Sequence, residues 1–340
     1  MPEIIKYAFG IEISKDSLDI RFGSIDTEQR TKISNTKSFK NTEQGIIELY
    51  LYRTSLVKDD KPVYYIMEAT GVYFEKLAFY LKEKGEKVIV ILPNKSKYYR
   101  QSLDPKGKSD EIDSAALTQL GLERNLREWE IPALAMRELK ELTREYETIN
   151  NMMTQFKNQL HAKKHSKFSF GSTEERLKQS IKMFNSQLKT ILSEIEKIIK
   201  QDPELYMKVD MIVNSLKGVG LITIAKIIAE TNCFSLIKNK NQLSSYAGLD
   251  VIEDSSGNRI GKTKISSKGN SHLRHALFMP ALSAIKYINE MKNLYARICI
   301  KHKAKKVGLT AVMRKLLILI YTLWKKNEPY NPTYGCNLIK

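Results

Sequence analysis

Four carboxylates stand where acidic side chains could act together. Glu12 lies at the end of the first predicted strand and Glu68 at the end of the fourth, whereas Asp110 and Asp113 lie three residues apart, on one face of a helix. If the two strands are neighbours, their carboxyl ends bring Glu12 and Glu68 together, and the helix can fold its aspartates over them. Such hard oxygen ligands suit two Mg²⁺ or Mn²⁺ ions about 4 Å apart at one phosphodiester. Acids are also common at strand ends and on helices. Spacing alone therefore does not distinguish a metal site from ordinary surface acids.

A serine with basic neighbours is a second candidate for phosphodiester chemistry. Residues 250–267 predict a β-hairpin or irregular loop with Ser255, Ser256 and Gly257 at its tip. An exposed serine among cations has the features of a nucleophile, because cations bind the phosphate and stabilise charge in the transition state. The same residues also suit a simple turn, so the sequence leaves both interpretations open. The cations that follow the tip are Arg259, Lys262 and Lys264.

Strands and helices that could position the carboxylates fill residues 1–130. Short strands joined by turns come first, and strand and helix then alternate, which implies parallel pairing and an α/β layer. We therefore expect an α/β domain over this range. The predicted strands are 4–13, 17–23, 30–35, 61–68 and 86–92, and the predicted helices are 41–53, 72–84 and 108–122.

A helical region and a mixed C-terminal domain follow. Residues 131–205 carry apolar residues at spacings of three and four, which predicts two long helices joined around residues 167–172 as an antiparallel or intermolecular coiled coil. This region is either an ordinary linker or an assembly element. Residues 206–330 predict a mostly α domain with a β-hairpin. Its turn at 216–221, LKGVGL, either presents N–H groups to a phosphate or forms a plain corner between helices.

The positive charge is concentrated in the last third of the chain. The 340 residues carry 56 Lys and Arg against 38 Asp and Glu, and residues 211–340 alone carry 21 basic against 6 acidic side chains. Such a segment repels itself unless it meets a polyanion, so nucleic acid is the expected partner. An anionic membrane surface is the competing partner, but turn signals interrupt the basic residues, and the apolar run 316–323 is too short to span a bilayer. The three cysteines lack paired spacing, which argues against zinc and disulfides and fits a reducing cytoplasm.

Several cations are predicted to contact nucleic acid. Basic and aromatic residues alternate over residues 95–100, which suits base stacking and backbone contacts, and a helix that begins near Ser271 suits a phosphate at its N-terminus. Solvated surface charge is the alternative. The predicted contacts are Lys15, Lys95, Lys97, Arg100, Arg259, Lys262, Lys264, Lys268 and Arg274.

Short motifs in a fixed order resemble one family, the DEDD insertion-sequence transposases, which include the Piv-type DNA invertases and the bridge-RNA-guided recombinases. Its RuvC-like domain is similar to four segments: GIEISKDSLDI at 10–20, MEATGVYFEKLAFYLKEKG at 67–85, VILPNKSKYYRQS at 90–102 and KSDEIDSAALTQLG at 108–121. Its second domain is similar to two segments: LKGVGLITIAKIIAE at 216–230 and the stretch 243–277.

The resemblance implies a fold and roles for individual residues. It implies an N-terminal domain of the RuvC-like, RNase H-like α/β fold that binds Mg²⁺ or Mn²⁺. It also implies that a serine of the second domain attacks DNA and holds it covalently; Ser256 is the matching position, with Ser255 as the second choice. The four acids that match the family's metal ligands are Glu12, Glu68, Asp110 and Asp113.

The first of these acids departs from the family pattern. The family usually has Asp at this position, whereas this chain has Glu12. The additional methylene changes the reach of the carboxylate, and catalytic sites tolerate little misplacement. The nearest alternative acid is Asp16, in the following turn.

The function that the resemblance implies is DNA recombination. We expect a transposase that cuts and rejoins DNA at an insertion-sequence end and its target, as a dimer or tetramer in which the metal domain of one subunit completes the serine domain of another. A structured guide RNA is expected to supply sequence recognition, in the bacterial cytoplasm at the nucleoid. Two other functions stay open: a metal-dependent junction nuclease that hydrolyses with water, and a nucleic-acid-binding protein without catalysis.

Overall fold

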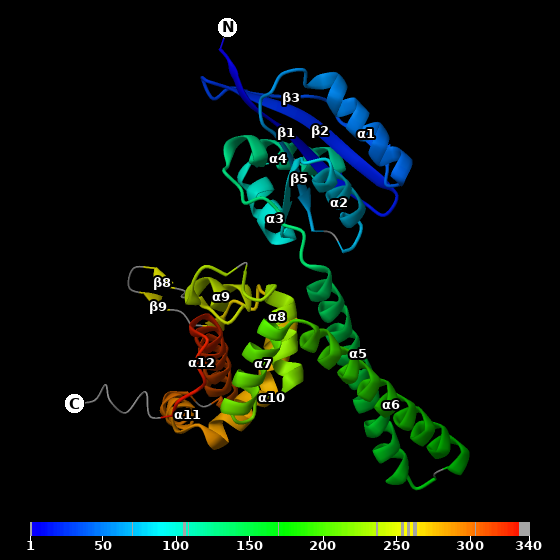
Figure 1. The fold of residues 1–340 in the computed structure, drawn as a ribbon, viewed down its shortest axis with the longest axis vertical. Coiled ribbons are helices and arrows are strands. Elements are labelled where there is room, and N and C mark those ends of the chain that lie inside the picture. Colours follow the sequence, from blue (N-terminus) through cyan, green and yellow to red (C-terminus); the bar gives the residue numbers. More distant parts are fainter. Residues whose placement is uncertain are drawn as a thin grey trace, which may run out of the picture. The chain divides into compact units, whose positions relative to one another are not determined.

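The computed structural model divides the chain into two compact units, Met1–Ile131 and Pro132–Lys340, which are described separately (Figure 1). It describes residues 2–332 except 70, 105, 106, 108, 169, 236, 253, 254, 257, 258, 261–263 and 303, and of residues 255, 256, 259 and 260 it describes the backbone only. The predicted order of an α/β domain, two long helices and a mostly α region with a β-hairpin is confirmed.

The first unit is built on one mixed sheet with four helices. Its strands are β1 (Ile4–Ile13), β2 (Ser17–Asp26), β3 (Thr31–Ile33), β4 (Lys37–Lys40), β5 (Val63–Glu68) and β6 (Lys87–Ile91), and its helices are α1 (Glu43–Leu56), α2 (Glu75–Glu83), α3 (Pro93–Ser102) and α4 (Asp110–Glu123). The strand order is β3-β2-β1-β5-β6, and β4 pairs with β2 outside this path. The strand β1 pairs antiparallel with β2 but parallel with β5, and β5 pairs parallel with β6, as the alternation of strand and helix predicts.

The two faces of this sheet pack on different helices. Successive residues of a strand point to opposite faces. Phe9 of β1 lies in the core shared with α1 and α2, whereas Ala8 of β1 and Ile66 of β5 lie in the core shared with α4. Glu12 is four residues after Ala8 and Glu68 is two residues after Ile66, so both glutamates lie on the face that α4 covers.

Two elements go beyond the sequence prediction, helix α3 and strand β4. Helix α3 begins with Pro93, a residue that suits the first helical position, yet none of its residues, all of them described, is buried. A helix without a buried face has no apolar stripe, so hydrophobic periodicity does not indicate it. Strand β4 is only four residues long, with one half-buried side chain, Phe39.

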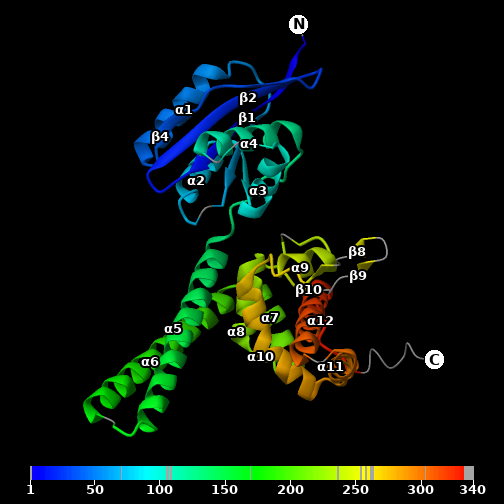
Figure 2. The same ribbon diagram turned by 180° about the vertical axis from the view of Figure 1, so that it is seen from behind.

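The second unit begins with a helical hairpin. Helices α5 (Leu134–Lys164) and α6 (Gly171–Gln201) lie side by side and antiparallel in both views (Figures 1 and 2). The rings of Phe156 and Phe184 meet edge to face between them, with centroids 5.3 Å apart. The two long helices therefore pair within the chain as the predicted antiparallel hairpin, and intermolecular pairing stays a prediction.

The remaining helices enclose one hydrophobic core. They are α7 (Pro203–Ser215), α8 (Leu221–Thr231), α9 (Lys240–Tyr246), α10 (Ser271–Tyr287), α11 (Asn289–Lys301) and α12 (Lys305–Lys326). Leu139 of α5 and Ile195 of α6 are fully buried in the same core, so the base of the helical hairpin is anchored there.

Helix α12 is longer than the apolar run 316–323 seen in the sequence. By length and composition alone its 22 residues could cross a membrane, with a mean hydropathy of 1.5 over the most apolar window. More than half of that window is buried inside the unit, where Leu316, Leu317 and Ile320 are fully enclosed. The described fold therefore uses α12 as a core helix.

Two turns of the second unit test the sequence interpretation. In the turn LKGVGL, Gly218 has a φ of +89°, and a Cβ there would lie 2.4 Å from Cβ of Ser283 on α10. This turn is a tight corner packed on α10. The predicted β-hairpin consists of two antiparallel ladders, β7 (Val251–Ile252) with β10 (Lys264–Ile265) and β8 (Ser255–Ser256) with β9 (Arg259–Ile260).

Candidate functional site

Two of the four predicted carboxylates lie side by side at the carboxyl ends of adjacent strands. In the parallel pairing of β1 with β5, Ile11 stands opposite Met67. The next residue of each strand is Glu12 and Glu68, and both therefore point to the α4 face of the sheet. As the sequence predicts, neighbouring parallel strands bring these two acids to one edge.

Helix α4 brings a third carboxylate over this edge, because small residues let it approach the sheet closely. A Cβ on Gly10 of β1 would lie 2.2 Å from the backbone nitrogen of Thr118, and a Cβ on Gly121 would lie 2.2 Å from Cδ1 of Ile66. The Gly10 N–H also donates to the Thr118 hydroxyl at 3.1 Å. The helix is therefore fixed against β1 and β5, with Asp113 in its first turn.

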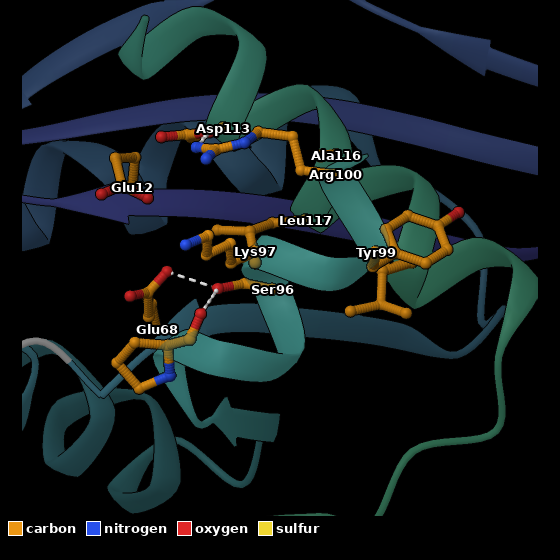
Figure 3. Close-up of a pocket in the computed structure, with 11 residues that line it drawn as sticks. Glu12, Glu68, Ser96, Lys97, Tyr99, Arg100, Asp113, Ala116 and Leu117 are labelled. Carbon is orange, nitrogen blue, oxygen red and sulfur yellow. Dashed lines mark hydrogen bonds and ion pairs between the residues drawn. The ribbon is translucent and has the colours of Figure 1, made fainter. Parts of the chain in front are cut away.

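A cavity of about 220 Å³ lies where these elements meet (Figure 3). Glu12, Glu68 and Asp113 line it, from β1, β5 and α4. The cavity is also lined by α3 residues, among them Ser96, Lys97 and Arg100. The structure thus brings three of the four predicted acids to one cavity. The fourth, Asp110, is exposed one turn earlier on α4 and is not among the residues that line it.

Helix α3 holds two of these three carboxylates. Arg100 forms an ion pair with Asp113, and the Ser96 hydroxyl donates to Oε2 of Glu68 at 2.6 Å (Figure 3). Ser96 also lies 2.9 Å from the Pro93 carbonyl, which fixes its rotamer at the start of the helix. With the carboxylates held in this way, no three His, Cys, Asp or Glu side chains of the described residues are gathered closely enough to hold a metal ion.

The donor set nevertheless fits a hard divalent cation in kind. Three carboxylates and one hydroxyl supply oxygen atoms, which Mg²⁺ and Mn²⁺ prefer over nitrogen or sulfur. Glu12, Glu68 and Asp113 are the residues that would hold such an ion. Asp113 must then exchange its ion pair with Arg100 for the metal.

The cations predicted near this site occupy different places. Lys97 and Arg100 line the cavity, whereas Lys95 is exposed on α3 away from the lining and Lys15 is exposed in the β1–β2 turn. The exposed Asp16 lies in that same turn. Sequence reasoning missed Ser96 because it did not predict helix α3, which has no buried face.

The predicted nucleophile falls where only the backbone is described. Ser256 is in β8, paired with Arg259 of β9, and the side chains of Ser255, Ser256 and Arg259 lie outside the described residues. Lys262 lies outside them altogether. Lys264 in β10 and Lys268 before α10 are described and exposed.

Arg274 of α10 is used within the fold. Its Nη1 donates to the carbonyls of Ala247 and Gly269, at 2.9 and 3.0 Å. These bonds tie α10 to the turn after α9. Contact of Arg274 with nucleic acid stays a prediction.

Two acids of the second unit join the helical hairpin to α8 and α10: Glu230 is buried and Glu147 is half-buried. Neither was singled out from the sequence. Glu230 of α8 is 3% exposed; Arg144 of α5 donates to both of its carboxylate oxygens, at 2.7 and 3.1 Å, and Asn270 donates at 2.7 Å. Burial by itself raises the pKa of Glu230, but the bonds from Arg144 and Asn270 and the charge of Lys140 outweigh it, so the pKa lies below its ordinary value.

The second acid, Glu147 of α5, meets three cationic or titratable partners. Lys226 of α8 lies 3.3 Å from its carboxylate, and the Nδ1 atoms of His272 and His275 on α10 lie at 3.2 and 2.7 Å. Burial raises the pKa of Glu147, whereas Lys226 and the two histidines lower it more. The start of α10, which follows the serine segment, is therefore joined to α5 through the contacts of His272 and His275 with Glu147.

Comparison with known proteins gives two family matches along the chain. Residues 9–168 match the transposase family model DEDD_Tnp_IS110, and residues 210–296 match the model of the transposase IS116/IS110/IS902 family. The pilin gene-inverting protein of Moraxella lacunata is 27% identical over 328 residues, which is 96% of this chain and 98% of that protein. The transposase for insertion sequence element IS1111A of Coxiella burnetii is 27% identical over 121 residues, 35% of this chain and 33% of that protein.

Among solved structures, Thermus thermophilus RuvC aligns with 36% of this chain and 99% of its own, at 10% identity and a TM-score of 0.29. The two family models together match more than half of the chain. The chain therefore belongs to the IS110-type DEDD transposases, with the DEDD domain first and the IS116/IS110/IS902 transposase domain second.

Proposed function

We propose that this transposase cuts and rejoins DNA at an insertion-sequence end and its target, using a metal-binding first domain and a serine in the second. The observation that carries the proposal is the convergence of Glu12, Glu68 and Asp113, which are up to 101 positions apart in the chain, on one cavity. The family supports DNA as the substrate. A relative that inverts a pilin gene supports rearrangement of DNA over simple cleavage.

In the first domain, Glu12, Glu68, Asp113 and, from one turn earlier, Asp110 would hold Mg²⁺ or Mn²⁺. The metal, when bound, supplies charge stabilisation at a phosphodiester and lowers the pKa of an oxygen nucleophile. Ser96 and Arg100 orient the carboxylates of Glu68 and Asp113 before metal is bound. Lys97, at the same cavity, adds a positive charge for the DNA phosphate.

In the second domain, Ser256 is the proposed nucleophile, with Ser255 as the alternative. Its Oγ bonds to phosphorus while the bond from phosphorus to one deoxyribose oxygen breaks. The serine proton passes to a carboxylate of a metal domain, and the departing oxygen takes up a proton to become a hydroxyl. A hydroxyl of the partner strand then reverses the step and releases the serine, so the number of phosphodiester bonds is conserved.

The proposal includes an assembly. A dimer or tetramer would let the metal domain of one subunit complete the serine domain of another, and a structured guide RNA would supply sequence recognition. The basic last third of the chain supports binding of a polyanion. We place this activity in the bacterial cytoplasm, at the nucleoid.

The deciding experiment traps the covalent intermediate. Protein coexpressed with its native flanking DNA is incubated with labelled insertion-sequence ends and Mg²⁺, and adducts that resist denaturant are counted. We expect Ser256→Ala to abolish the adduct and Ser255→Ala to retain it. Loss only in Ser255→Ala would assign the other serine, and cleavage without an adduct in either variant would establish a nuclease that uses water.

The same preparation tests the guide RNA. RNA that remains bound through a high-salt purification is sequenced, and a discrete species that maps to the flanking DNA is the expected result. Recovery of bulk degraded RNA alone would favour an invertase that reads DNA without a guide. If the wild type and Glu12→Asp both bind DNA but form no adduct and cleave nothing, the protein binds nucleic acid without catalysis.

A further inference from the structure

The second unit contains a cavity of about 900 Å³ that no part of the proposed chemistry uses. It lies between the β7–β10 ladder and the helices α11 and α12. Its wall is aliphatic, formed by Leu249, Val251, Ile265, Leu294, Ile298 and Ile318. Two apolar residues of the lining, Val251 and Val307, are 50% and 42% exposed.

The rim of this cavity is basic. Lys264 of β10 and Lys306, Arg314 and Lys315 of α12 line it, together with His302, and no Asp or Glu is among the described residues that do. Lys306 and Arg314 are eight residues apart on one helix, and so about 12 Å apart along its axis. Cations spread over this length match a ligand with several separated negative charges better than a single small anion.

One of these cations is held in place by the fold. Nε of Arg314 lies 3.3 Å from the hydroxyl of Ser244, which is 1% exposed on α9. A guanidinium anchored through one nitrogen loses less side-chain entropy when it binds an anion. The cavity therefore has an aliphatic wall and at least one cation that is ordered before a ligand arrives.

We propose that this cavity takes an unpaired nucleotide, with its base against the aliphatic wall and the neighbouring phosphates on the rim. A paired duplex presents phosphates but keeps its bases stacked, so it cannot fill an apolar wall; a base turned out of the stack can. The strands β7 and β10 are the two ends of the segment that carries Ser256. A nucleotide held here would thus lie beside the strand on which the proposed nucleophile acts, and in this respect the inference rests on the proposed function.

The test compares two oligonucleotides that differ by one unpaired base. Each is a duplex that contains a fluorescent adenine analogue, which is paired in one duplex and bulged in the other. We expect the full-length protein to bind the bulged duplex about tenfold more tightly than the paired one. We also expect the analogue to brighten on binding, because no aromatic ring other than that of His302 is among the described residues of the wall to quench it.

Two variants and a matched control assign the effect to the cavity. Thr310→Glu places a negative charge on the lining, and Ala311→Trp fills the space; each should remove the preference for the bulged duplex and the brightening. Thr310 is partly exposed on α12, so a glutamate there can be solvated. Thr310→Glu is therefore the variant to use if Ala311→Trp does not fold. Lys305→Ala removes an exposed lysine of the same helix that does not line the cavity, and it should weaken both duplexes equally.

Several outcomes would overturn the inference. Equal affinity of the wild type for both duplexes would show that the cavity takes no base. A second outcome is that the wild type shows no preference between the duplexes but binds a helical peptide rich in Leu and Glu, and Thr310→Glu does not bind that peptide. This outcome would assign the cavity to a protein partner. The proposed function is tested by a different measurement, the covalent adduct. Absence of that adduct would refute the proposed function but would leave the binding of the bulged duplex unchanged.

Discussion

The guanidinium of Arg100 forms an ion pair with the carboxylate of Asp113, and both side chains are less than one-fifth exposed. A proposed metal ligand is therefore occupied by a cation from the adjacent helix. A metal bound here, as proposed, would compete with the guanidinium for the oxygen atoms of Asp113.

We therefore expect Arg100→Ala to bind Mn²⁺ about tenfold more tightly than the wild type, because the metal no longer displaces a guanidinium. Titration of Mn²⁺ followed by electron paramagnetic resonance measures this directly, without DNA. Lys95→Ala, on the exposed side of the same helix, is the control and should not change the affinity. Equal Mn²⁺ affinity in Arg100→Ala and wild type, with both folded, would refute the competition.

Glu12 is the residue to change for catalysis. Glu12→Asp shortens the side chain by one methylene and restores the residue that the family usually has, so we expect about tenfold more covalent adduct per unit time. Glu12→Gln should abolish the adduct. Asp16→Asn is the control, since Asp16 is exposed in the turn and should be dispensable. If Asp16→Asn instead abolishes the adduct while Glu12→Gln does not, Asp16 is the ligand.

Glu230 should dominate the stability of the second unit. Glu230→Gln removes the buried charge to which Arg144 and Asn270 donate hydrogen bonds, which should cost about 2 kcal/mol in the free energy of unfolding. Urea unfolding at neutral pH measures the loss. Glu204→Gln breaks an exposed pair with Lys208 on α7 and should cost less than about 0.5 kcal/mol.

The pH dependence of that loss has a definite sign. The pKa of Glu230 is lowered in the folded protein, so its contribution is fully present above the unfolded pKa, about 4.3, and is lost as the pH falls through the lower folded value. Wild type and Glu230→Gln should therefore differ most at neutral pH and converge in acid. A difference that stays constant down to the acid transition would show that Glu230 acts by shape alone.

The close approach of α4 to β1 should tolerate no methyl group at Gly10. A Cβ there would lie 2.2 and 2.3 Å from backbone atoms of Thr118 and Ser114, which cannot move without shifting α4. We expect Gly10→Ala to cost about 2 to 3 kcal/mol in unfolding free energy and to lower Mn²⁺ affinity, because Asp113 moves with α4. Gly107→Ala, where a Cβ meets open space, is the control and should be neutral. If Gly10→Ala is as stable as the wild type, α4 does not approach β1 as closely as described.

The sequence by itself determined the elements with strong local patterns. The strands that end at Glu12 and Glu68, the helix that begins at Asp110 and the two long helices of residues 131–205 all follow from hydrophobic period, turn residues and capping. Family motifs then predict the four acids and the serine as site residues. These signals are local, so each is complete within a dozen residues of the chain.

Only the tertiary structure decided which groups meet. Helix α3 has no buried face, so its period carries no signal, yet it supplies Ser96 and Arg100 to the carboxylates. Asp110 and Asp113 share a helix face, but only Asp113 lines the cavity. The contacts of Glu230 with Arg144, and of Glu147 with Lys226, His272 and His275, join residues 79 to 128 positions apart. Such pairings depend on how helices pack, and packing is a property of surfaces that no single segment of sequence contains.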